Sequence, residues 1–389
     1  ATTTTTTMSN MKEDDTKLFP YNSRIVRLKD EDRFQVCLDL RRRRETTTET
    51  QTQTEEDELT QRVPRIGDVT AQLAVFDGHI TNLAAKYAEK HWLEYVFKAT
   101  EKEKEETAKE KKRKGGSKPV LRETSSLEPS DAFGDAEDVL SEEIDFDLEK
   151  ALIRATRDLE KGFKQHGLEE GDESVHVKRS GCFGTCFGGK QKVPTGGTTV
   201  TSASIQRGLD TKEGDATFYI VCASCGDSGA LLLPHPNEHD PDDLEVNLRA
   251  HKRLTREHNA DDPLEAVRLV QSGCRLGRMQ RADGSEIGPL RAYPGGFAVS
   301  RAVGDFAVPG ITCEPEVTRV KVPKTGARLL VASDGVFAAI SDGDISEICA
   351  TLSSSKECAD KIIEKVLELR GRHDDITLLI ADIPPPEEY

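Results

Sequence analysis

The sequence predicts an α+β fold whose sheets are antiparallel. Segments with the two-residue alternation of strands mostly follow one another, while segments with helical periodicity come in blocks. Two apolar strands are joined by the Gly-rich turn Cys225-Gly-Asp-Ser-Gly229, which is typical of a hairpin. A parallel sheet would instead require a long crossover, usually a helix, between successive strands.

Each predicted strand is indicated by β-branched residues, by alternation of apolar and polar residues, or by a short apolar run. The earlier ones alternate apolar and polar residues, whereas the later ones are almost continuously apolar and are expected to be buried. In chain order they are residues 34–40, 69–76, 198–205, 216–223, 230–233, 328–332 and 376–381.

The predicted helices show apolar residues recurring every three or four positions. They are residues 82–98, 147–165, 262–271, 344–351 and 359–370. Pro263 suits the first turn of its helix, where a missing N–H costs little. Trp92 lies on the apolar face of the first helix and is predicted to be a core residue.

Three polar stretches, at about residues 46–59, 101–143 and 169–197, are predicted to be insertions. They have little apolar surface to bury, so we expect them to be mobile. Residues 22–383 are then one domain, between an N-terminal tail of residues 1–21 and a C-terminal tail of residues 384–389. The threonine run before Met8 is interpreted as a cloning remnant.

The composition is acidic, with 54 Lys+Arg against 70 Asp+Glu and a formal net charge of −16. Such a chain gains little from counterion release, so nucleic acid is not an expected partner. The basic runs 41–44 and 109–114 could be docking patches, but solvated charged loops are the preferred interpretation.

The sequence also indicates a cellular environment. No apolar run approaches the about 20 residues needed to span a bilayer. The nine cysteines are irregularly spaced and no secretory leader precedes them. We therefore expect reduced thiols in a cytoplasmic or nuclear protein.

Acidic residues recur where the predicted strands begin or end. They are Glu31, Asp32, Asp77, Asp227, Asp334, Asp374 and Asp375. Carboxylates that converge repel one another unless a cation lies between them, and Mg²⁺ and Mn²⁺ prefer oxygen ligands. A single Asp-Gly is usually a plain turn, so the hypothesis of a metal site depends on the ordered set.

That set resembles the motifs of the metal-dependent serine/threonine protein phosphatase family, type 2C class. The resemblance covers about residues 22–383 without the insertions. The matching motifs, in order, are Arg27-Leu-Lys-Asp-Glu31-Asp32, Val75-Phe76-Asp77-Gly78-His79, Gly197-Thr198-Thr199, Gly226-Asp227-Ser228, Leu254-Thr-Arg-Glu-His258, Ser300-Arg301-Ala302-Val303-Gly304-Asp305, Ala332-Ser333-Asp334-Gly335 and Asp374-Asp375-Ile376-Thr377.

The resemblance implies an α-β-β-α sandwich, in which two antiparallel sheets are flanked by helices. It also implies that residues 22–383 form a single phosphatase catalytic domain holding two divalent cations, Mg²⁺ or Mn²⁺. Asp77 would bridge the cations. Asp334 and Asp374 would hold one of them, and Glu31 and the Gly78 carbonyl the other.

Further roles follow from the same resemblance. Asp32 would act on the metals through water, and Asp227 would belong to a weaker third metal site. A water shared by the metals would attack the phosphorus of phosphoserine or phosphothreonine. His79 would protonate the leaving oxygen and Arg27 would grip the phosphate. The expected partners are phosphoprotein substrates, and the expected state is a monomer.

The chain departs from the family pattern at several positions. Ile80 and Gly229 replace a usual Gly and Arg, Asp375 replaces a usual Asn, and Ala338 replaces the Asp that helps Asp227 hold the third metal. Ile80 and Ala338 motivate an alternative function, a weakly active or inactive pseudophosphatase that acts as a binding scaffold.

Other motifs have plainer interpretations. Cys222-Ala-Ser-Cys225 has redox or zinc spacing but no second pair, so it is predicted to pack in the core. For Cys182 and Cys186, metal binding, acylation and disulfide formation stay open beside a flexible loop with incidental thiols. His251 and His258 are predicted to be surface or loop residues.

Overall fold

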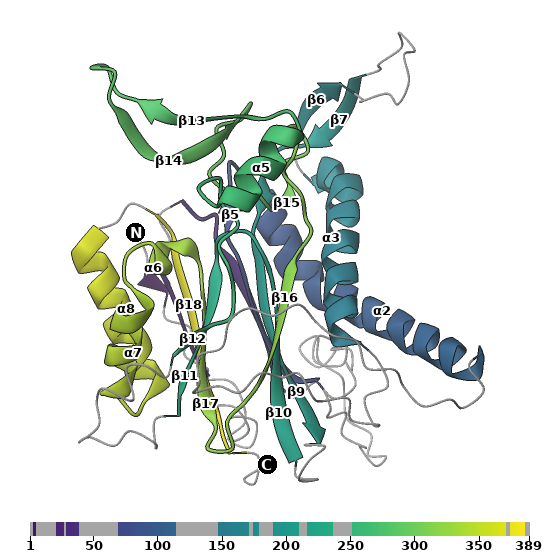
Figure 1. Ribbon diagram of the computed structural model, residues 1–389, viewed down its shortest axis with the longest axis vertical. Coiled ribbons are helices and arrows are strands. Elements are labelled where there is room, and N and C mark those ends of the chain that lie inside the picture. The colour runs from purple at the N-terminus through teal and green to yellow at the C-terminus, as the bar shows by residue number, and fades with distance from the viewer. Residues whose placement is uncertain are drawn as a thin grey trace, which may run out of the picture.

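The computed structural model describes residues 3–4, 21–26, 29–38, 69–113, 147–170, 174–178, 190–209, 216–235, 251–370 and 374–385. These residues form a sandwich of two large antiparallel sheets with helices on both outer faces (Figure 1). The predicted α+β class and the α-β-β-α arrangement are therefore confirmed. None of the helices in the described ranges combines the length and apolar character needed to cross a membrane.

The first sheet holds most of the C-terminal strands. Its order is β1 (Thr3–Thr4), β2 (Tyr21–Val26), β18 (Ile376–Ile383), β17 (Ala327–Ala332), β11 (Gly229–Pro234) and β12 (Lys252–Arg253). The second sheet has the order β16 (Glu316–Lys321), β10 (Ala216–Cys225), β9 (Val200–Leu209), β4 (Val69–Phe76) and β3 (Arg33–Leu38).

The predicted hairpin across the turn at Asp227 is wrong. β10 pairs with β9 and β16, whereas β11 pairs with β12 and β17 in the other sheet. The turn therefore carries the chain from one sheet to the other. Periodicity could not distinguish these arrangements, because two buried apolar strands look alike whether they pair with each other or face each other.

The space between the sheets is filled by side chains from the inner strands. Leu73, Ile220, Leu329 and Leu379 are fully buried there and belong to one hydrophobic cluster. Because helices also cover the outer faces, the central strands are buried on both sides, which explains their continuous apolar runs.

Two helix pairs cover the outer faces (Figure 1). α2 (Leu83–Arg113) and α3 (Leu148–Glu170) pack on the second sheet, and Trp92 meets Phe76 edge-on at 6.4 Å between ring centroids. α7 (Asp342–Ala350) and α8 (Ser355–Arg370) pack on the first sheet. The prediction of Trp92 as a core residue is confirmed.

Parts of the predicted insertions are ordered elements. α2 continues through residues 101–113, where ion pairs such as Lys104–Glu101 and Lys109–Glu105 join successive turns. Arg154 of α3 also pairs with Glu103. A highly charged sequence can thus remain helical when its charges alternate in sign along one face.

The third predicted insertion likewise contains strands. β6 (Ser174–Lys178) and β7 (Lys190–Pro194) pair with each other, and α3 extends to Glu170. Residues 41–44, 46–59 and 114–143, with Cys182 and Cys186, lie outside the described residues.

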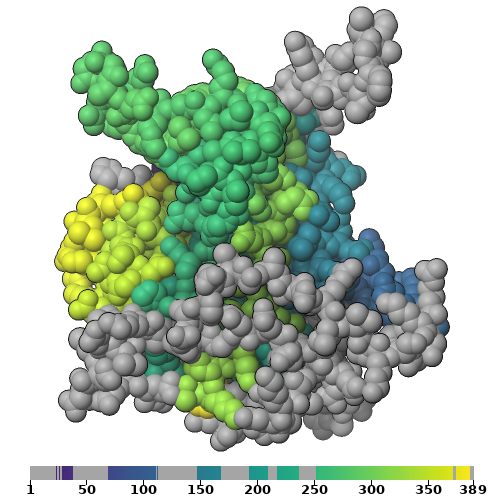
Figure 2. Space-filling view, in the orientation of Figure 1, coloured from purple at the N-terminus to yellow at the C-terminus, as the bar shows by residue number. Residues whose placement is uncertain are grey.

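A smaller group of elements stands at one end of the sandwich. It contains α5 (Pro263–Gln271) and the projecting pair β13 (Arg275–Gln280) and β14 (Glu286–Tyr293) (Figures 1 and 2). A short sheet of β5 (Gly78–His79), β8 (Gly197–Thr198) and β15 (Val303–Gly304) lies beneath them. Sequence periodicity missed β13 and β14, since most of their residues are exposed.

Candidate metal centre

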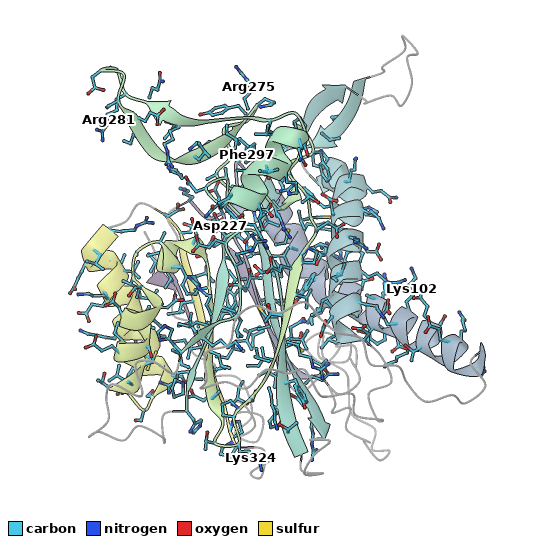
Figure 3. The ribbon with its side chains drawn as sticks, viewed as in Figure 1. Lys102, Asp227, Arg275, Arg281, Phe297 and Lys324 are labelled. Carbon is cyan, nitrogen blue, oxygen red and sulfur yellow. The ribbon has the colours of Figure 1, made fainter. Side chains whose placement is uncertain are left out.

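Three carboxylates from distant parts of the chain meet at this end of the sandwich. Asp77 follows β4, Asp227 lies in the turn between the two sheets, and Asp334 begins the short helix α6 (Asp334–Phe337) after β17. One carboxylate oxygen from each residue lies within 4.8 Å of the other two. Figure 3 places Asp227 at the ends of the central strands, below Phe297. The strand ends of both sheets therefore supply this cluster.

The electrostatics of the cluster favour a cation. Burial raises the pKa of Asp77, and the nearby Asp32, Asp334 and Asp227 raise it further. Burial, followed by the charge of Asp334, raises the pKa of Asp227 to about 8. Burial is also the main cause that raises the pKa of Asp334. A group of oxygen ligands that resists ionising together fits a hard divalent ion, whose charge would stabilise the ionised carboxylates.

Asp32 lies on the buried side of the cluster. Its carboxylate accepts a hydrogen bond of 2.7 Å from Thr377 Oγ1. Burial raises the pKa of Asp32 to about 7, against the hydrogen bond from Thr377. The charge of Asp32 also raises the pKa of Asp77, so Asp32 acts on the three-carboxylate group.

Asp375 anchors the loop that carries Glu31. Its carboxylate accepts hydrogen bonds from the backbone N–H groups of Lys29 and Glu31, each at 2.7 Å, and of Asp32 at 3.1 Å. The side chain is buried. The structure therefore gives this departure from the family pattern a positioning role, in which backbone donors compensate its negative charge.

Glu31 and Asp374 lie nearer the solvent than the three-carboxylate group. Lys29 Nζ is 2.8 Å from Asp374 Oδ1 and 3.9 Å from Glu31 Oε2. Asp374 raises the pKa of Asp334, so its charge acts on the cluster. Lys29 was missed in the sequence because the family motif fixes only the residues on either side of it.

The Gly78 backbone packs closely against the Glu31 loop. A Cβ at position 78 would lie 2.7 Å from the Glu31 carbonyl oxygen, which is closer than real Cβ atoms approach. The glycine thus allows the two backbones to meet, and it brings the Gly78 carbonyl and Glu31 to one region.

His79 is held by Asp305, the last residue of the motif that begins at Ser300. His79 Nε2 lies 2.6 Å from Asp305 Oδ2. Burial alone would lower the pKa of His79, but the charge and hydrogen bond of Asp305 outweigh it and raise that pKa. A Cβ at Gly197 would lie 2.5 Å from Asp305 Oδ2, so this glycine makes room for the pair.

Ile80 adopts a backbone conformation that favours glycine. Its φ is 69°, in the left-handed region, and its side chain is 58% exposed. An L-residue with a branched Cβ is strained there. The departure at position 80 therefore keeps the loop conformation of a glycine and displays an apolar side chain beside His79.

His258 supports the turn that carries Asp227. It lies in a loop, which is one of the two predicted alternatives, and not at the surface. The side chain is fully buried. The Gly226 N–H lies 3.3 Å from His258 Nδ1, and His258 Nε2 lies 3.2 Å from Glu316 Oε2. The flanking polar sequence gave no sign of this burial, which comes from tertiary contacts. His251 is partly buried in a loop.

Glu265 ties α5 to the segment around Ser300. Its carboxylate accepts hydrogen bonds from Arg268, Arg301 and Ser300, at 2.6, 2.5 and 2.8 Å. These bonds outweigh the effect of burial and lower the pKa of Glu265 to about 2. The network fixes the elements that surround His79 and Asp305.

The remaining predicted site positions have separate outcomes. Arg27 lies outside the described residues. Ala338 caps the C-terminus of α6 and offers no carboxylate toward Asp227. At Gly229, a Cβ would lie 2.5 Å from Arg253 Nη1, and the Arg253 guanidinium stacks 3.7 Å from the centroid of Phe337. An arginine from another strand therefore fills the space beside this glycine.

Comparisons with known proteins agree with this geometry. A model of the protein phosphatase 2C family matches residues 130–375. Probable protein phosphatase 2C 3 of Oryza sativa subsp. japonica is 34% identical over 200 residues, which cover 49% of this chain and 39% of the relative. Probable protein phosphatase 2C 5 of Arabidopsis thaliana is 34% identical over 202 residues, covering 50% and 41%. The match thus spans about two fifths of each relative's length.

Solved structures share the fold. The serine-threonine phosphatase 2C from Toxoplasma gondii superposes with a TM-score of 0.56 at 17% identity, covering 93% of this chain and 94% of that one. A C. elegans sex determining protein gives 0.54 at 20% identity, covering 95% of this chain and 65% of that one. At these identities the likeness concerns the architecture alone.

Proposed function

Because the chain belongs to the protein phosphatase 2C family, we propose that it hydrolyses phosphoserine and phosphothreonine esters in protein substrates. The observation that carries this proposal is the meeting of Asp77, Asp227 and Asp334 at the joint end of both sheets. Carboxylates gathered from distant segments, with their pKa values raised by one another, are typical of a functional centre.

We infer that two divalent cations, Mg²⁺ or Mn²⁺, are held by Asp77, Asp334, Asp374, Glu31 and the Gly78 carbonyl. Such a pair of ions supplies a hydroxide near neutral pH and stabilises charge on a transferring phosphoryl group. Asp32 would orient a ligating water from its buried position. Asp227 contributes a further oxygen, which supports either the pair or a third ion.

We assign proton donation to His79. The leaving serine or threonine oxygen is a strong base and must be protonated as its bond to phosphorus breaks. Asp305 engages Nε2, so Nδ1 is the ring nitrogen left to donate toward a substrate. Asp305 also favours the charged imidazolium, which keeps a proton available near neutral pH. Arg27 is proposed to bind the phosphate through its planar guanidinium.

The proposal is tested with an aryl phosphate and a phosphothreonine peptide as substrates, in the presence and absence of Mn²⁺. We expect metal-dependent hydrolysis, with a rate that falls at least about 100-fold in Asp77→Asn. Mutation of residues that only hydrogen-bond to metal ligands already lowers metal affinity or activity about 10–100-fold, and Asp77 is proposed to be a ligand itself. Exposed Asp283→Asn, on the β13–β14 hairpin, is the matched control and should retain the full rate.

A second candidate is the scaffold without significant turnover, which the lack of a carboxylate at Ala338 favours. The same experiment separates the two functions. Equal rates with and without metal, and equal rates for the native protein and Asp77→Asn, would support the scaffold and exclude the enzyme.

We further infer that residues 22–383 form the single catalytic domain, that the protein acts as a monomer, and that it works in the cytoplasm or nucleus. The continuous sandwich, built from strands at both ends of this range, supports the domain assignment. Size-exclusion chromatography with light scattering would test the monomer.

A further inference from the structure

A lysine side chain contacts the carboxylates of the proposed metal centre. Lys29 Nζ lies 2.8 Å from Asp374 Oδ1 and 3.9 Å from Glu31 Oε2. In the proposed function, Asp374 is a ligand of one divalent cation and Glu31 is a ligand of the other. One ammonium group therefore contacts a ligand of each ion, and it supplies there the kind of charge that the ions would supply.

The backbone on both sides of this contact is fixed. The Lys29 N–H donates to Asp375 Oδ1 at 2.7 Å, and the Asp375 N–H donates to Asp374 Oδ1 at 2.9 Å. Asp374 Oδ1 thus accepts from a backbone donor of its own loop as well as from the Lys29 ammonium. Because Asp375 joins the two loops, backbone contacts bring Lys29 and Asp374 opposite each other.

The residue after Lys29 keeps its loop in one conformation. Asp30 has a φ of 60°, in the left-handed region. Arg33 Nη1 lies 3.1 Å from the Asp30 carbonyl oxygen and Nη2 lies 3.2 Å from Oδ2, while Asn82 Nδ2 lies 3.3 Å from the same carbonyl oxygen. Such a conformation persists only where surrounding contacts enforce it. The loop therefore fixes the direction in which the Lys29 side chain leaves the backbone.

The end of the Lys29 side chain is free to leave its partners. The side chains of Lys29 and Asp374 are 47% and 44% exposed. An ion pair as exposed as this is weak, because water can replace either partner, and lysine has a flexible stem with a strongly hydrated head. The ammonium can therefore turn into solvent without any movement of the loop.

We propose that Lys29 is an internal counterion of the metal centre, which competes with divalent cations for Asp374 and Glu31 and so lowers the affinity of the centre for them. This inference rests on the proposed function, because it requires that both carboxylates are metal ligands. The Lys29 ammonium holds together carboxylates that repel one another. Lys29 must turn away before the same Asp374 oxygen can serve a metal ion, so the centre fills only where divalent cations outcompete this ammonium.

The first test measures Mn²⁺ binding by titration calorimetry. Lys29→Met keeps an unbranched side chain and the backbone N–H that Asp375 accepts, but it removes the charge. We expect Lys29→Met to bind Mn²⁺ about fivefold more tightly than the native protein, the upper end of what an exposed ion pair contributes. Lys29→Arg keeps the charge and should bind no more tightly than the native protein. Lys356→Met, which removes an exposed lysine of α8, is the matched control and should bind as the native protein does.

The same variants are then unfolded by urea in the presence of a chelator. We expect metal-free Lys29→Met to unfold at lower urea concentrations than the native protein, because the carboxylates lose their counterion. The substitution thus tightens metal binding and weakens the metal-free fold. A lysine that only supported the loop would lower the stability and the metal affinity together.

A further measurement uses the native protein and does not depend on the folding of a variant. Acetic anhydride modifies the unprotonated amine of lysine, whereas the carboxylates around Lys29 favour its ammonium form. Addition of Mn²⁺ should therefore raise the rate of acetylation at Lys29, followed by mass spectrometry of proteolytic peptides. The rate at the exposed Lys356 should stay the same.

The outcomes distinguish this inference from the proposed function. Equal Mn²⁺ affinity in the native protein and Lys29→Met, or a Lys29 acetylation rate that Mn²⁺ does not change, would overturn the inference and leave the metal centre intact. Weaker binding in Lys29→Met would also overturn it, because Lys29 would then position the ligands instead of competing for them. If the native protein bound no Mn²⁺, or bound it no more tightly than Asp77→Asn, the metal centre itself would be excluded and the inference with it.

Discussion

At the scale of single residues, the contact between His79 and Asp305 joins the proposed proton donor to a carboxylate that is buried behind it. Asp305 itself has a φ of 49°, and Gly197 leaves the space that the pair occupies. Backbone strain of this kind persists only where surrounding contacts enforce it, and it is concentrated at functional sites. The pair should therefore matter for the chemistry beyond its contribution to folding.

Replacement of Asp305 by Asn keeps the shape of the side chain and removes its charge. We expect the phosphothreonine peptide to be hydrolysed about 100-fold more slowly, the lower end of the range for general acid catalysis. An aryl phosphate, whose leaving group needs little protonation, should be affected much less. Steady-state rates on both substrates provide the comparison. Equal losses on the two substrates would mean that Asp305 acts on folding or metal binding instead.

Ile80 provides a prediction about stability. A left-handed conformation costs an L-residue about 1–2 kcal/mol, which exceeds the about 0.4–1 kcal/mol of additional chain entropy that glycine loses on folding. Since the side chain is 58% exposed, little burial is lost. Ile80→Gly should therefore raise the free energy of unfolding by about 0.5–1 kcal/mol in urea denaturation. Ile80→Val keeps the branched Cβ and should show no such gain, and a destabilised Ile80→Gly would contradict this account.

At the scale of elements, the sequence identified strands and helices well where burial produces a clear pattern. β4 has the predicted bounds, and β17 differs by one residue. Pairing was harder to predict, because the turn at Asp227 connects two sheets. Charged or exposed elements, such as the end of α2 and the pair β13 and β14, carry no apolar stripe and were missed.

The Glu265 network joins α5 to the segment that precedes β15, and it should make stability depend on pH. The folded-state pKa of Glu265 is about 2, below the value of about 4.3 for an unperturbed glutamate. The stabilisation by ionised Glu265 is therefore complete at pH values above the pKa of the unfolded state. It is lost as the pH falls toward the pKa of the folded state. Glu265→Gln should unfold at lower urea concentrations than the native protein at neutral pH, and this difference should shrink on acidification.

The exposed Glu286→Gln on β14 is the control for that series and should follow the native protein throughout. If the difference between Glu265→Gln and the native protein were constant with pH, the lowered pKa would be contradicted, even if the variant were less stable.

At the scale of the whole molecule, the carboxylate cluster spans both sheets. Asp77 and Asp227 follow strands of the second sheet, whereas Asp334 follows a strand of the first. The ordered motifs in the sequence pointed to these residues, but spacing along the chain could not show which carboxylates lie closest. Asp227, assigned by resemblance to a weaker third site, is one of the three nearest neighbours. The contact of Lys29 with Asp374 carries no local signal. Asp305 does end one of the motifs, but its contact with His79 depends on folding.

Bound metal should stabilise the entire fold. A ligand that binds only the folded state adds about 2.7 kcal/mol when its concentration is 100 times its dissociation constant. We expect Mn²⁺ to raise the thermal midpoint and a chelator to reverse the effect, measured by calorimetry. The shift should be reduced in Asp77→Asn and unchanged in the exposed Asp283→Asn. An equal shift in all three proteins would indicate ions bound elsewhere.

Because the proposed ligands Asp77 and Asp334 follow strands of two facing sheets, metal affinity should depend on how the sheets pack against each other. A small slip of one layer against the other would alter the spacing of Asp77 and Asp334 without touching either. Conservative changes at Ile220 or Leu329, in the middle of the hydrophobic interior, could then retune the centre from a distance. Substitutions in the core of such a protein would therefore change its metal requirement without changing any ligand.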